Sequence, residues 1–193
     1  MSNWPDWLPL RDDLKGLTPY GAPQIQNVIA LNTNENPFSL PAEIVEKMST
    51  KISEIAIHLN RYPDRDAILL RTKLAEYINS QSALELKIEN IWAANGSNEI
   101  LQTLVLAFGQ NGALGFTPSY SMHPLIAKVC GVKWVSGKRD SDFTLNVVSA
   151  IAEIELHRPS LVFITTPNNP TGSALRTEQL LELATVSYTH LRA

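Results

Sequence analysis

Residues 161–172 read LVFITTPNNPTG, and this stretch decides the fold that we expect for the chain. Every residue from 161 to 164 is apolar, which is typical of a strand buried on both faces in a parallel sheet. The residues that follow are rich in Asn, Pro and Thr, with a glycine at the end, and Asn, Pro and Gly are the residues of tight turns. Ligands of open α/β sheets bind at the carboxyl ends of strands, so an Asn-rich turn here could aim an amide at a bound molecule. Taken alone, the stretch favours an ordinary turn.

Short apolar runs alternate with amphipathic stretches on the N-terminal side of this segment. The expected strands are 91–94, 113–116, 132–135 and 161–165, and the expected helices are 98–108, 121–129 and 147–156. Alternation of this kind indicates a mainly parallel sheet flanked by helices. The fold class that we predict is therefore α/β.

The first 38 residues follow a different pattern. They are rich in Pro, Asn, Gly and Thr without a sustained period, so we expect residues 1–38 to form an extended arm. Apolar residues at helical spacing then predict a helix from Pro41 and a second helix after Pro63, with Asp64 as its N-cap.

The composition excludes several classes of function. Lys and Arg number 16 against 19 Asp and Glu, and the net charge of −3 offers no basic field to nucleic acid or to an anionic membrane. No window approaches the ~20 apolar residues of a membrane span. Cys130 is the only cysteine and no His, Asp or Glu set stands at metal-ligand spacing, so we expect a cytoplasmic protein without a disulfide or a metal site. At roughly 150 residues per domain, the length of 193 corresponds to one domain and a fraction.

Two further segments between a strand and a helix could bind a ligand. Residues 94–99, ANGSNE, open a strongly amphipathic helix, whose unpaired first-turn N–H groups can receive a phosphate. An ordinary N-cap by Ser97 or Asn98 explains the same residues, and the segment matches neither the Walker phosphate loop nor the GxGxxG fingerprint. Residues 116–123, FTPSYSMH, place Tyr120 where its ring could stack on a flat heteroaromatic ring, or could simply pack.

The motifs, taken together and in order, resemble the N-terminal half of the fold-type I pyridoxal-phosphate aminotransferases. They are LNTNENP (31–37), RYPD (61–64), GSNE (96–99), PSY (118–120) and PNNPTG (167–172). Within this family the chain is most similar to the histidinol-phosphate aminotransferases. The stretches that favour this group are LTPYG (17–21) and LGFTPSYSMHP (114–124). The resemblance runs from about residue 8 to residue 185.

The resemblance implies pyridoxal 5'-phosphate as the cofactor and assigns four residues to it within one subunit. The backbone N–H groups of Ser97 and Asn98 would hold the cofactor phosphate, in agreement with the charge at a helix start. Tyr120 would stack on the pyridine ring, and Asn169 would hydrogen-bond the phenolic oxygen and so tune the ring.

The resemblance also implies a partner subunit and a substrate pocket. Tyr62 would reach the phosphate of the cofactor in the other subunit, which makes the expected protein a homodimer with shared sites. Tyr20 and Asn34 would line the pocket for a small-molecule substrate, which gives the arm a purpose.

The reaction implied is transfer of an amino group between glutamate/2-oxoglutarate and imidazole-acetol phosphate/L-histidinol phosphate, a step of histidine biosynthesis. A related aminotransferase for aromatic amino acids and a threonine-phosphate decarboxylase of the same fold are the alternatives. An interpretation of a different class is a non-catalytic module that binds phosphate at Ser97 and Asn98.

Two motifs of the family do not occur in this sequence: Asp-x-Ala-Tyr, which carries the acid for the ring nitrogen, and Ser-Lys, which carries the Schiff-base lysine. Lys128, Lys133 and Lys138 precede the PNNPTG turn, on the wrong side for the family order, and we expect them to be surface residues. We therefore expect residues 39–185 to be an incomplete N-terminal part of the large cofactor-binding domain, without catalysis of its own.

The C-terminal stretch has a separate interpretation. Residues 177–184 predict a helix with Thr177 as its N-cap, and the helical pattern stops at Val186. Residues 186–193, VSYTHLRA, resemble the translation of a transposase adapter used for sequencing libraries, and we expect them to have no biological role.

Overall fold

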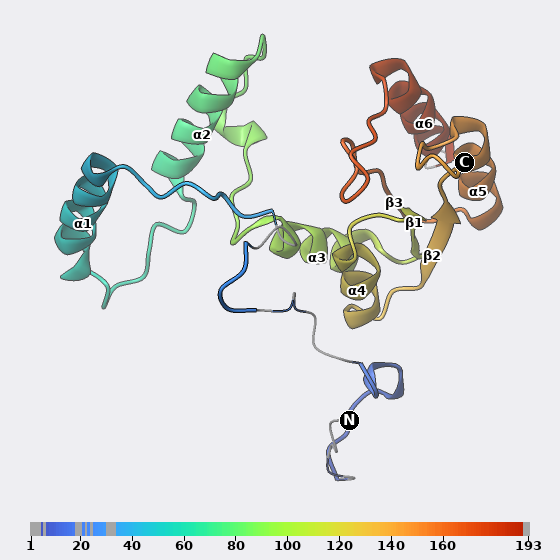
Figure 1. The fold of residues 1–193 in the computed structure, drawn as a ribbon, viewed down its shortest axis with the longest axis horizontal. Coiled ribbons are helices and arrows are strands. Elements are labelled where there is room, and N and C mark those ends of the chain that lie inside the picture. The colour runs from blue at the N-terminus through green and yellow to red at the C-terminus, as the bar shows by residue number, and fades with distance from the viewer. Residues whose placement is uncertain are drawn as a thin grey trace. The chain divides into compact units, whose positions relative to one another are not determined.

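The structure is a computed structural model that describes residues 5, 7–17, 21, 23, 25–29 and 34–190, with side chains to residue 186. Two compact units make up the chain. The first joins Met1–Gly16 to Ala94–Ala193, and the second is Leu17–Ala93. Figure 1 shows the elements of both units. The boundary expected after residue 38 concerns the domains of a longer enzyme and stays a prediction.

A three-stranded parallel sheet forms the centre of the first unit. Its strands are β1 (Ala113–Thr117), β2 (Trp134–Lys138) and β3 (Leu161–Phe163), in the order β2-β1-β3. In the register, Leu114 lies opposite Val135 on one side and Val162 on the other. Residues 113–116 are all buried, as the apolar run predicts for a central strand. The prediction of a mainly parallel α/β sheet is confirmed for this unit.

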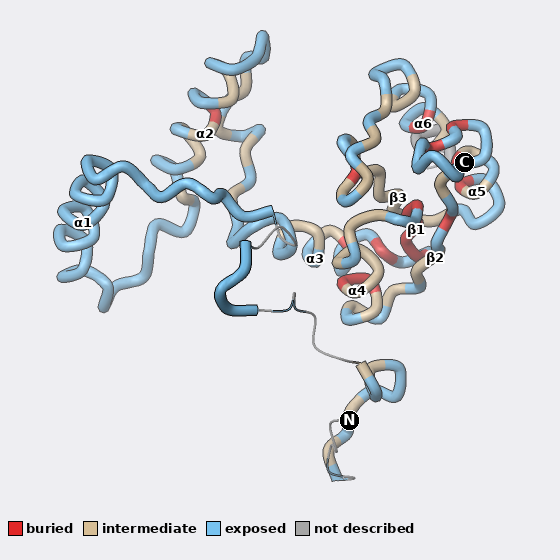
Figure 2. Tube along the Cα trace, in the orientation of Figure 1, coloured by how far each residue is buried: buried red, intermediate tan, exposed pale blue. Residues whose placement is uncertain are grey.

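Four helices flank this sheet (Figure 1). They are α3 (Ser97–Phe108), α4 (Met122–Val129), α5 (Val147–His157) and α6 (Thr177–His190). Leu114 and Phe116, two positions apart on β1, point to one face of the sheet and pack with Ile154 of α5 and Leu183 of α6. Figure 2 shows that buried residues gather around β1, α4 and α5. This core holds the strands whose carboxyl ends lead into the loops described below.

A 3-10 helix near the N-terminus, η1 (Asp12–Leu14), also belongs to the first unit. Arg11, just before it, donates from Nη1 to the carbonyl of Val129 (2.9 Å) and from Nη2 to that of Lys128 (3.0 Å). These carbonyls end α4, and a cation there satisfies acceptors that the helix leaves open. The start of the expected arm therefore lies on α4.

The second unit contains α1 (Ala42–Ala56), α2 (Ile68–Gln81) and the 3-10 helix η2 (Ile88–Asn90). The helix expected from Pro41 is confirmed, with Pro41 itself as the N-cap. Asp64 does not occupy the N-cap of α2, which is Ala67. Its carboxylate nevertheless accepts the N–H of Ile68 at 2.8 Å, so it caps the first turn from three residues further away.

The strand expected over 91–94 is wrong. The chain there is extended but pairs with no strand in the described part of the sheet. Arg71 of α2 explains the difference, because its guanidinium donates to the carbonyls of Ile91 and Ile88, each at 2.8 Å. The Arg71 side chain therefore uses the carbonyl of Ile91, an acceptor that a neighbouring strand would otherwise bond.

The boundaries of three other elements also differ from prediction. β2 begins at Trp134 rather than at residue 132, because the N–H of Val132 still bonds to Ala127 and closes the end of α4. Thr177 is the first residue of α6 rather than its N-cap, and the helix continues past Val186 to His190. At the start of α3 the N-cap is Gly96, not Ser97 or Asn98.

Candidate functional site

The loops that follow β1 and β3 meet at the carboxyl end of the sheet. Because β1 and β3 are parallel neighbours, residues 118–120 and residues 165–173 leave the sheet at the same edge. Ser119 Oγ donates to Asn168 Oδ1 at 2.8 Å and lies 3.2 Å from Thr165 Oγ1. The two sequence motifs PSY and PNNPTG are therefore joined directly by side chains almost 50 positions apart.

Asn168 is the centre of this junction. It is only 3% exposed, and it is the only polar residue among the described ones that is fully buried. Its amide nitrogen donates to the carbonyl of Pro118 (3.0 Å) and to Thr171 Oγ1 (2.8 Å). Its backbone N–H bonds to Ser173 O, and its carbonyl accepts from Gly172. Burial of an amide costs little when every group is paired in this way.

The neighbouring residue, Asn169, has the opposite environment. It is half-buried, and within the described residues its side-chain amide has no hydrogen-bond partner. The resemblance assigns the cofactor contact to this asparagine and not to Asn168. An amide that is held in place by its neighbour but is itself unpaired has the donor and acceptor needed for a ligand.

Tyr120 lies in a group of aromatic side chains. Its ring makes an edge-on contact with His123, with ring centroids 5.4 Å apart, and the His123 ring lies 5.0 Å from that of Phe163. A cavity of about 230 Å³ is lined by residues 116–121, His123, Pro124 and Trp134. Burial lowers the pKa of the His123 imidazole below its ordinary value, so the ring against Tyr120 is neutral at pH 7.

The start of α3 presents free space in front of its first turn. Gly96 has φ = 80°, which a glycine adopts without strain, and a Cβ at this position would meet no atom within 4 Å. No side chain caps the helix, and Ser97 and Asn98 are exposed. The Glu99 carboxylate accepts the N–H of Asn95 at 2.7 Å, and the described part of the chain shows no bond from it to the N–H groups of Ser97 and Asn98. The arrangement leaves the first-turn donors to an anion.

The remaining predicted site residues belong to the second unit. Tyr62 is fully exposed in the link between α1 and α2, and Asn34 is exposed in an irregular stretch. Tyr20 lies outside the described residues. The assignments of Tyr62, Asn34 and Tyr20 stay predictions.

The lysines before the PNNPTG turn agree largely with the surface positions expected for them. Lys133 and Lys138 are exposed, and Lys128 is half-buried.

Among the described residues, no helix is both long enough and apolar enough to span a membrane. The same part of the chain contains no group of three His, Cys, Asp or Glu side chains that could hold a metal.

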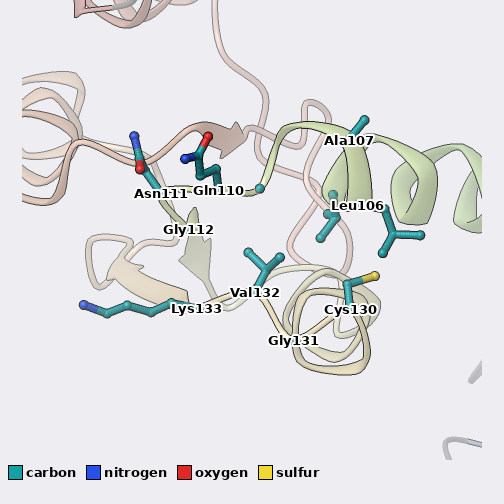
Figure 3. A pocket seen from close by; sticks show the side chains of 11 residues that line it. Leu106, Ala107, Gln110, Asn111, Gly112, Cys130, Gly131, Val132 and Lys133 are labelled. Carbon is teal, nitrogen blue, oxygen red and sulfur yellow. The ribbon is translucent and has the colours of Figure 1, made fainter.

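A second cavity in this unit lies elsewhere. A cavity of about 550 Å³ is bordered by the end of α3, the end of α4 and the residues just before β1 and β2 (Figure 3). Gly112 and Lys133, which immediately precede the two strands, line it, as does Cys130. None of the residues predicted for the site lines this cavity.

The residues that join the two loops are not among those predicted for the site. Ser119, Asn168, Thr171 and Ser173 stand inside or beside quoted motifs without an assigned role. The doubled asparagine at 168–169 is the signal that could have found them, because a turn needs at most one such amide for its own backbone.

Comparison with known proteins agrees with the sequence motifs. The family model for class I and II aminotransferases matches residues 26–192. The histidinol-phosphate aminotransferase of Mycobacterium sp. (strain KMS) is 52% identical over 178 residues, which are 91% of this chain and 47% of that protein. That of Thermobifida fusca is 53% identical over 88% of this chain and 46% of its own. That of Mycolicibacterium smegmatis is 48% identical over 90% of this chain and 80% of its own.

Solved structures agree on the fold. A mutant of Thermus thermophilus aspartate aminotransferase has a TM-score of 0.69 at 19% identity, over 94% of this chain and 48% of that one. The aromatic aminotransferase of Pyrococcus horikoshii has a TM-score of 0.68 at 22% identity, over 86% and 45%. The chain spans about half the length of most of the relatives it matches. It belongs to the class I and II aminotransferase family, and its fold is the N-terminal part of the fold-type I aminotransferases.

Proposed function

We propose that this chain is part of a pyridoxal 5'-phosphate-dependent aminotransferase of histidine biosynthesis. The reaction would move an amino group between glutamate/2-oxoglutarate and imidazole-acetol phosphate/L-histidinol phosphate. The observation that carries the proposal is the identity of 48–53% to three proteins named histidinol-phosphate aminotransferase. The geometry at the carboxyl end of the sheet supports the cofactor.

The start of α3 fits the phosphate of the cofactor. The N–H groups of Ser97 and Asn98 lie in the first turn without a side-chain cap, beside the open space at Gly96. Exposed donors at the positive end of a helix attract a dianion without needing a basic side chain. The carboxylate of Glu99 accepts the N–H of Asn95, and among the described residues it makes no bond to the N–H groups proposed for the phosphate.

The loops after β1 and β3 fit the ring. Tyr120 offers an aromatic face supported from the side by His123, which suits offset stacking on a pyridine. Asn169 offers an unpaired amide whose N–H can donate to the phenolic oxygen. The bound group supplies an electron sink for the bond that breaks in amino transfer.

The part of the site that this chain supplies would bind and orient the cofactor. The acid for the ring nitrogen and the Schiff-base lysine stand in family motifs that the 193 residues do not contain. We therefore assign the proton transfers to other segments, and to this chain the holding of phosphate and ring. Orientation alone contributes several kcal/mol to a reaction barrier when the geometry is held closely.

We also propose that the protein acts as a homodimer. Full exposure of the Tyr62 phenol is compatible with a residue that completes its contacts on a partner subunit. Tyr20 and Asn34 are proposed for the substrate pocket. These assignments rest on the motifs RYPD, LTPYG and LNTNENP.

A chimera tests the reaction. Residues 8–185 of this chain would replace the matching segment of the Thermobifida fusca enzyme, with the unchanged enzyme as control. We expect formation of glutamate from 2-oxoglutarate with L-histidinol phosphate as donor, and at least tenfold less with L-phenylalanine. A preference for L-phenylalanine would favour the aromatic aminotransferase instead. Release of carbon dioxide from a threonine phosphate would favour the decarboxylase.

A further inference from the structure

We infer that Asn168 is a positioning residue that sets Tyr120 and Asn169 at a fixed mutual distance. The inference rests on the proposed cofactor site and names a residue that acts on it without touching the cofactor. Its side chain is 3% exposed and directed into the protein, so its own amide is not available to a ligand.

Chain connectivity places both proposed cofactor residues beside the junction of the two loops. Ser119 immediately precedes Tyr120, and Asn168 immediately precedes Asn169. Neighbouring Cα atoms are held about 3.8 Å apart by the covalent chain. Fixing Ser119 to Asn168 therefore leaves the two proposed cofactor residues one peptide unit away from a common anchor, one on each loop.

The anchor is made by both ends of the Asn168 amide. Its oxygen accepts from Ser119 Oγ (2.8 Å), and its nitrogen donates to Pro118 O (3.0 Å). Two adjacent residues of the loop after β1 are thus held by one planar group. A planar amide with an acceptor on one side and a donor on the other fixes orientation as well as distance, which a single contact would not.

The anchor extends to a third loop. The Asn168 amide nitrogen also donates to Thr171 Oγ1 (2.8 Å), which lies 2.9 Å from Ser173 Oγ. Ser173 Oγ in turn donates to the carbonyl of Phe143 at 2.9 Å. Phe143 belongs to the loop after β2, so one connected set of bonds joins the loops that follow all three strands. A connected network of this kind, centred on a buried and fully paired amide, restricts the movement of the loops that it joins.

Binding of pyridoxamine 5'-phosphate to the 193-residue chain tests the inference, because this ligand needs no lysine. We expect Asn168→Ala to weaken the affinity about 10-fold or more, as loss of a buried and paired amide would. Ser119→Ala removes one of the same bonds by a milder change and should weaken the affinity by a smaller factor. Asn111→Ala, at the opposite end of β1, is the matched control and should bind as the wild type does.

A double-mutant cycle separates positioning from a general loss of stability. If Asn168 acts through Asn169, the Asn168→Ala change should weaken binding less than threefold when Asn169→Ala is already present. Full additivity of the two changes would overturn the inference. So would affinities within twofold of wild type for both Asn168→Ala and Ser119→Ala.

Hydrogen exchange without any ligand gives a second readout. In Asn168→Ala and Ser119→Ala, we expect exchange to rise together in residues 117–121 and 166–173, with α3 and α5 unchanged. A rise confined to 166–173 would overturn the inference. Absence of pyridoxamine 5'-phosphate binding by the wild-type chain would count against the proposed function instead, and the exchange pattern would then decide the inference by itself.

Discussion

The two ends of the sheet differ in how their polar groups are used. At the carboxyl end, a cavity of about 230 Å³ lies beside side chains that bond to each other across 46 and 49 positions of sequence and to a backbone carbonyl across 50. At the amino end, a cavity of about 550 Å³ is lined by Gln110, Asn111 and Lys133, which are exposed. In Figure 3 the Lys133 side chain extends away from Cys130.

The polar contacts at the amino end serve the backbone. The N–H of Asn111 donates to Ser160 Oγ at 2.8 Å, and the N–H of Ser160 bonds to Gly112 O. These bonds align the residues that precede β1 and β3. Among the described residues at this end, no side-chain amide is fixed by buried neighbours and also free to bind a ligand. The larger of these two cavities and the proposed site therefore lie at opposite ends of the sheet, and the proposed site is the one whose side chains are fixed by buried neighbours.

The largest effect on stability is expected from a change in the middle of the sheet, which supports both ends. Leu114 is fully buried in the middle of β1, and Leu114→Ala should lower the free energy of unfolding by about 3 kcal/mol, from lost burial and the cavity left behind. Leu156→Ala, on an exposed face of α5, should cost less than about 0.5 kcal/mol. Urea denaturation measures both. Equal small losses would show that the two ends are not supported by one core.

The next prediction separates the two cavities. Tyr120→Ala should weaken binding of pyridoxamine 5'-phosphate about 10-fold, because an aromatic face and its burial are lost. Lys133→Ala should leave the affinity unchanged, although it removes a cation from the larger cavity. Isothermal titration of the chain measures both. A stronger effect at Lys133 than at Tyr120 would reverse the assignment of the site.

Much of the sheet could be predicted from the sequence because its signals are local. The apolar run at β1 and the amphipathic stretches of α3, α4 and α5 specify burial by composition and period alone. The strand expected over 91–94 fails where it would begin, because the carbonyl of Ile91 is bonded by Arg71, twenty positions earlier in the chain. No periodicity within the segment itself records that contact.

The proposed site residues also differ in whether local sequence or long-range contacts identify them. Tyr120, Asn169 and the start of α3 could be proposed because each lies at a junction of strand and helix and within a recognisable motif. The role of Asn168 could not, because its partners Ser119 and Pro118 follow a different strand. Long-range pairing of side chains becomes visible only when the register of β1 and β3 is known.

A pH dependence should distinguish the carboxyl end. Burial lowers the pKa of His123 below the ordinary value of about 6.5 that the unfolded chain has. Between the two pKa values the unfolded chain binds the proton and the folded one does not, so stability falls as pH drops below about 6.5. His123→Gln should reduce this slope. Denaturation midpoints from pH 5 to 8 measure it. Identical slopes in wild type and His123→Gln would contradict the assignment.

The smallest effect is expected at the anchor of the N-terminal segment. Two exposed arginines each form a close ion pair with a neighbouring aspartate, Arg11 with Asp13 and Arg65 with Asp66. Only Arg11 also reaches across more than 100 positions, to the carbonyls of Lys128 and Val129 that end α4. The ion pairs alone contribute little at the surface, so any difference between the two arginines comes from this long-range contact.

Arg11→Ala should therefore speed chymotrypsin cleavage near Leu14, whereas Arg65→Ala should leave that rate unchanged. Cleavage requires the N-terminal segment to leave its contacts with the rest of the unit. Loss of the bonds from Arg11 to the carbonyls at the end of α4 should make this release easier. An unchanged rate in Arg11→Ala would mean that packing around η1 holds the segment without the guanidinium. In that case the bonds from Arg11 to the carbonyls of Lys128 and Val129 would add nothing to the attachment of this segment, and the long-range polar contacts that matter would be those at the carboxyl end.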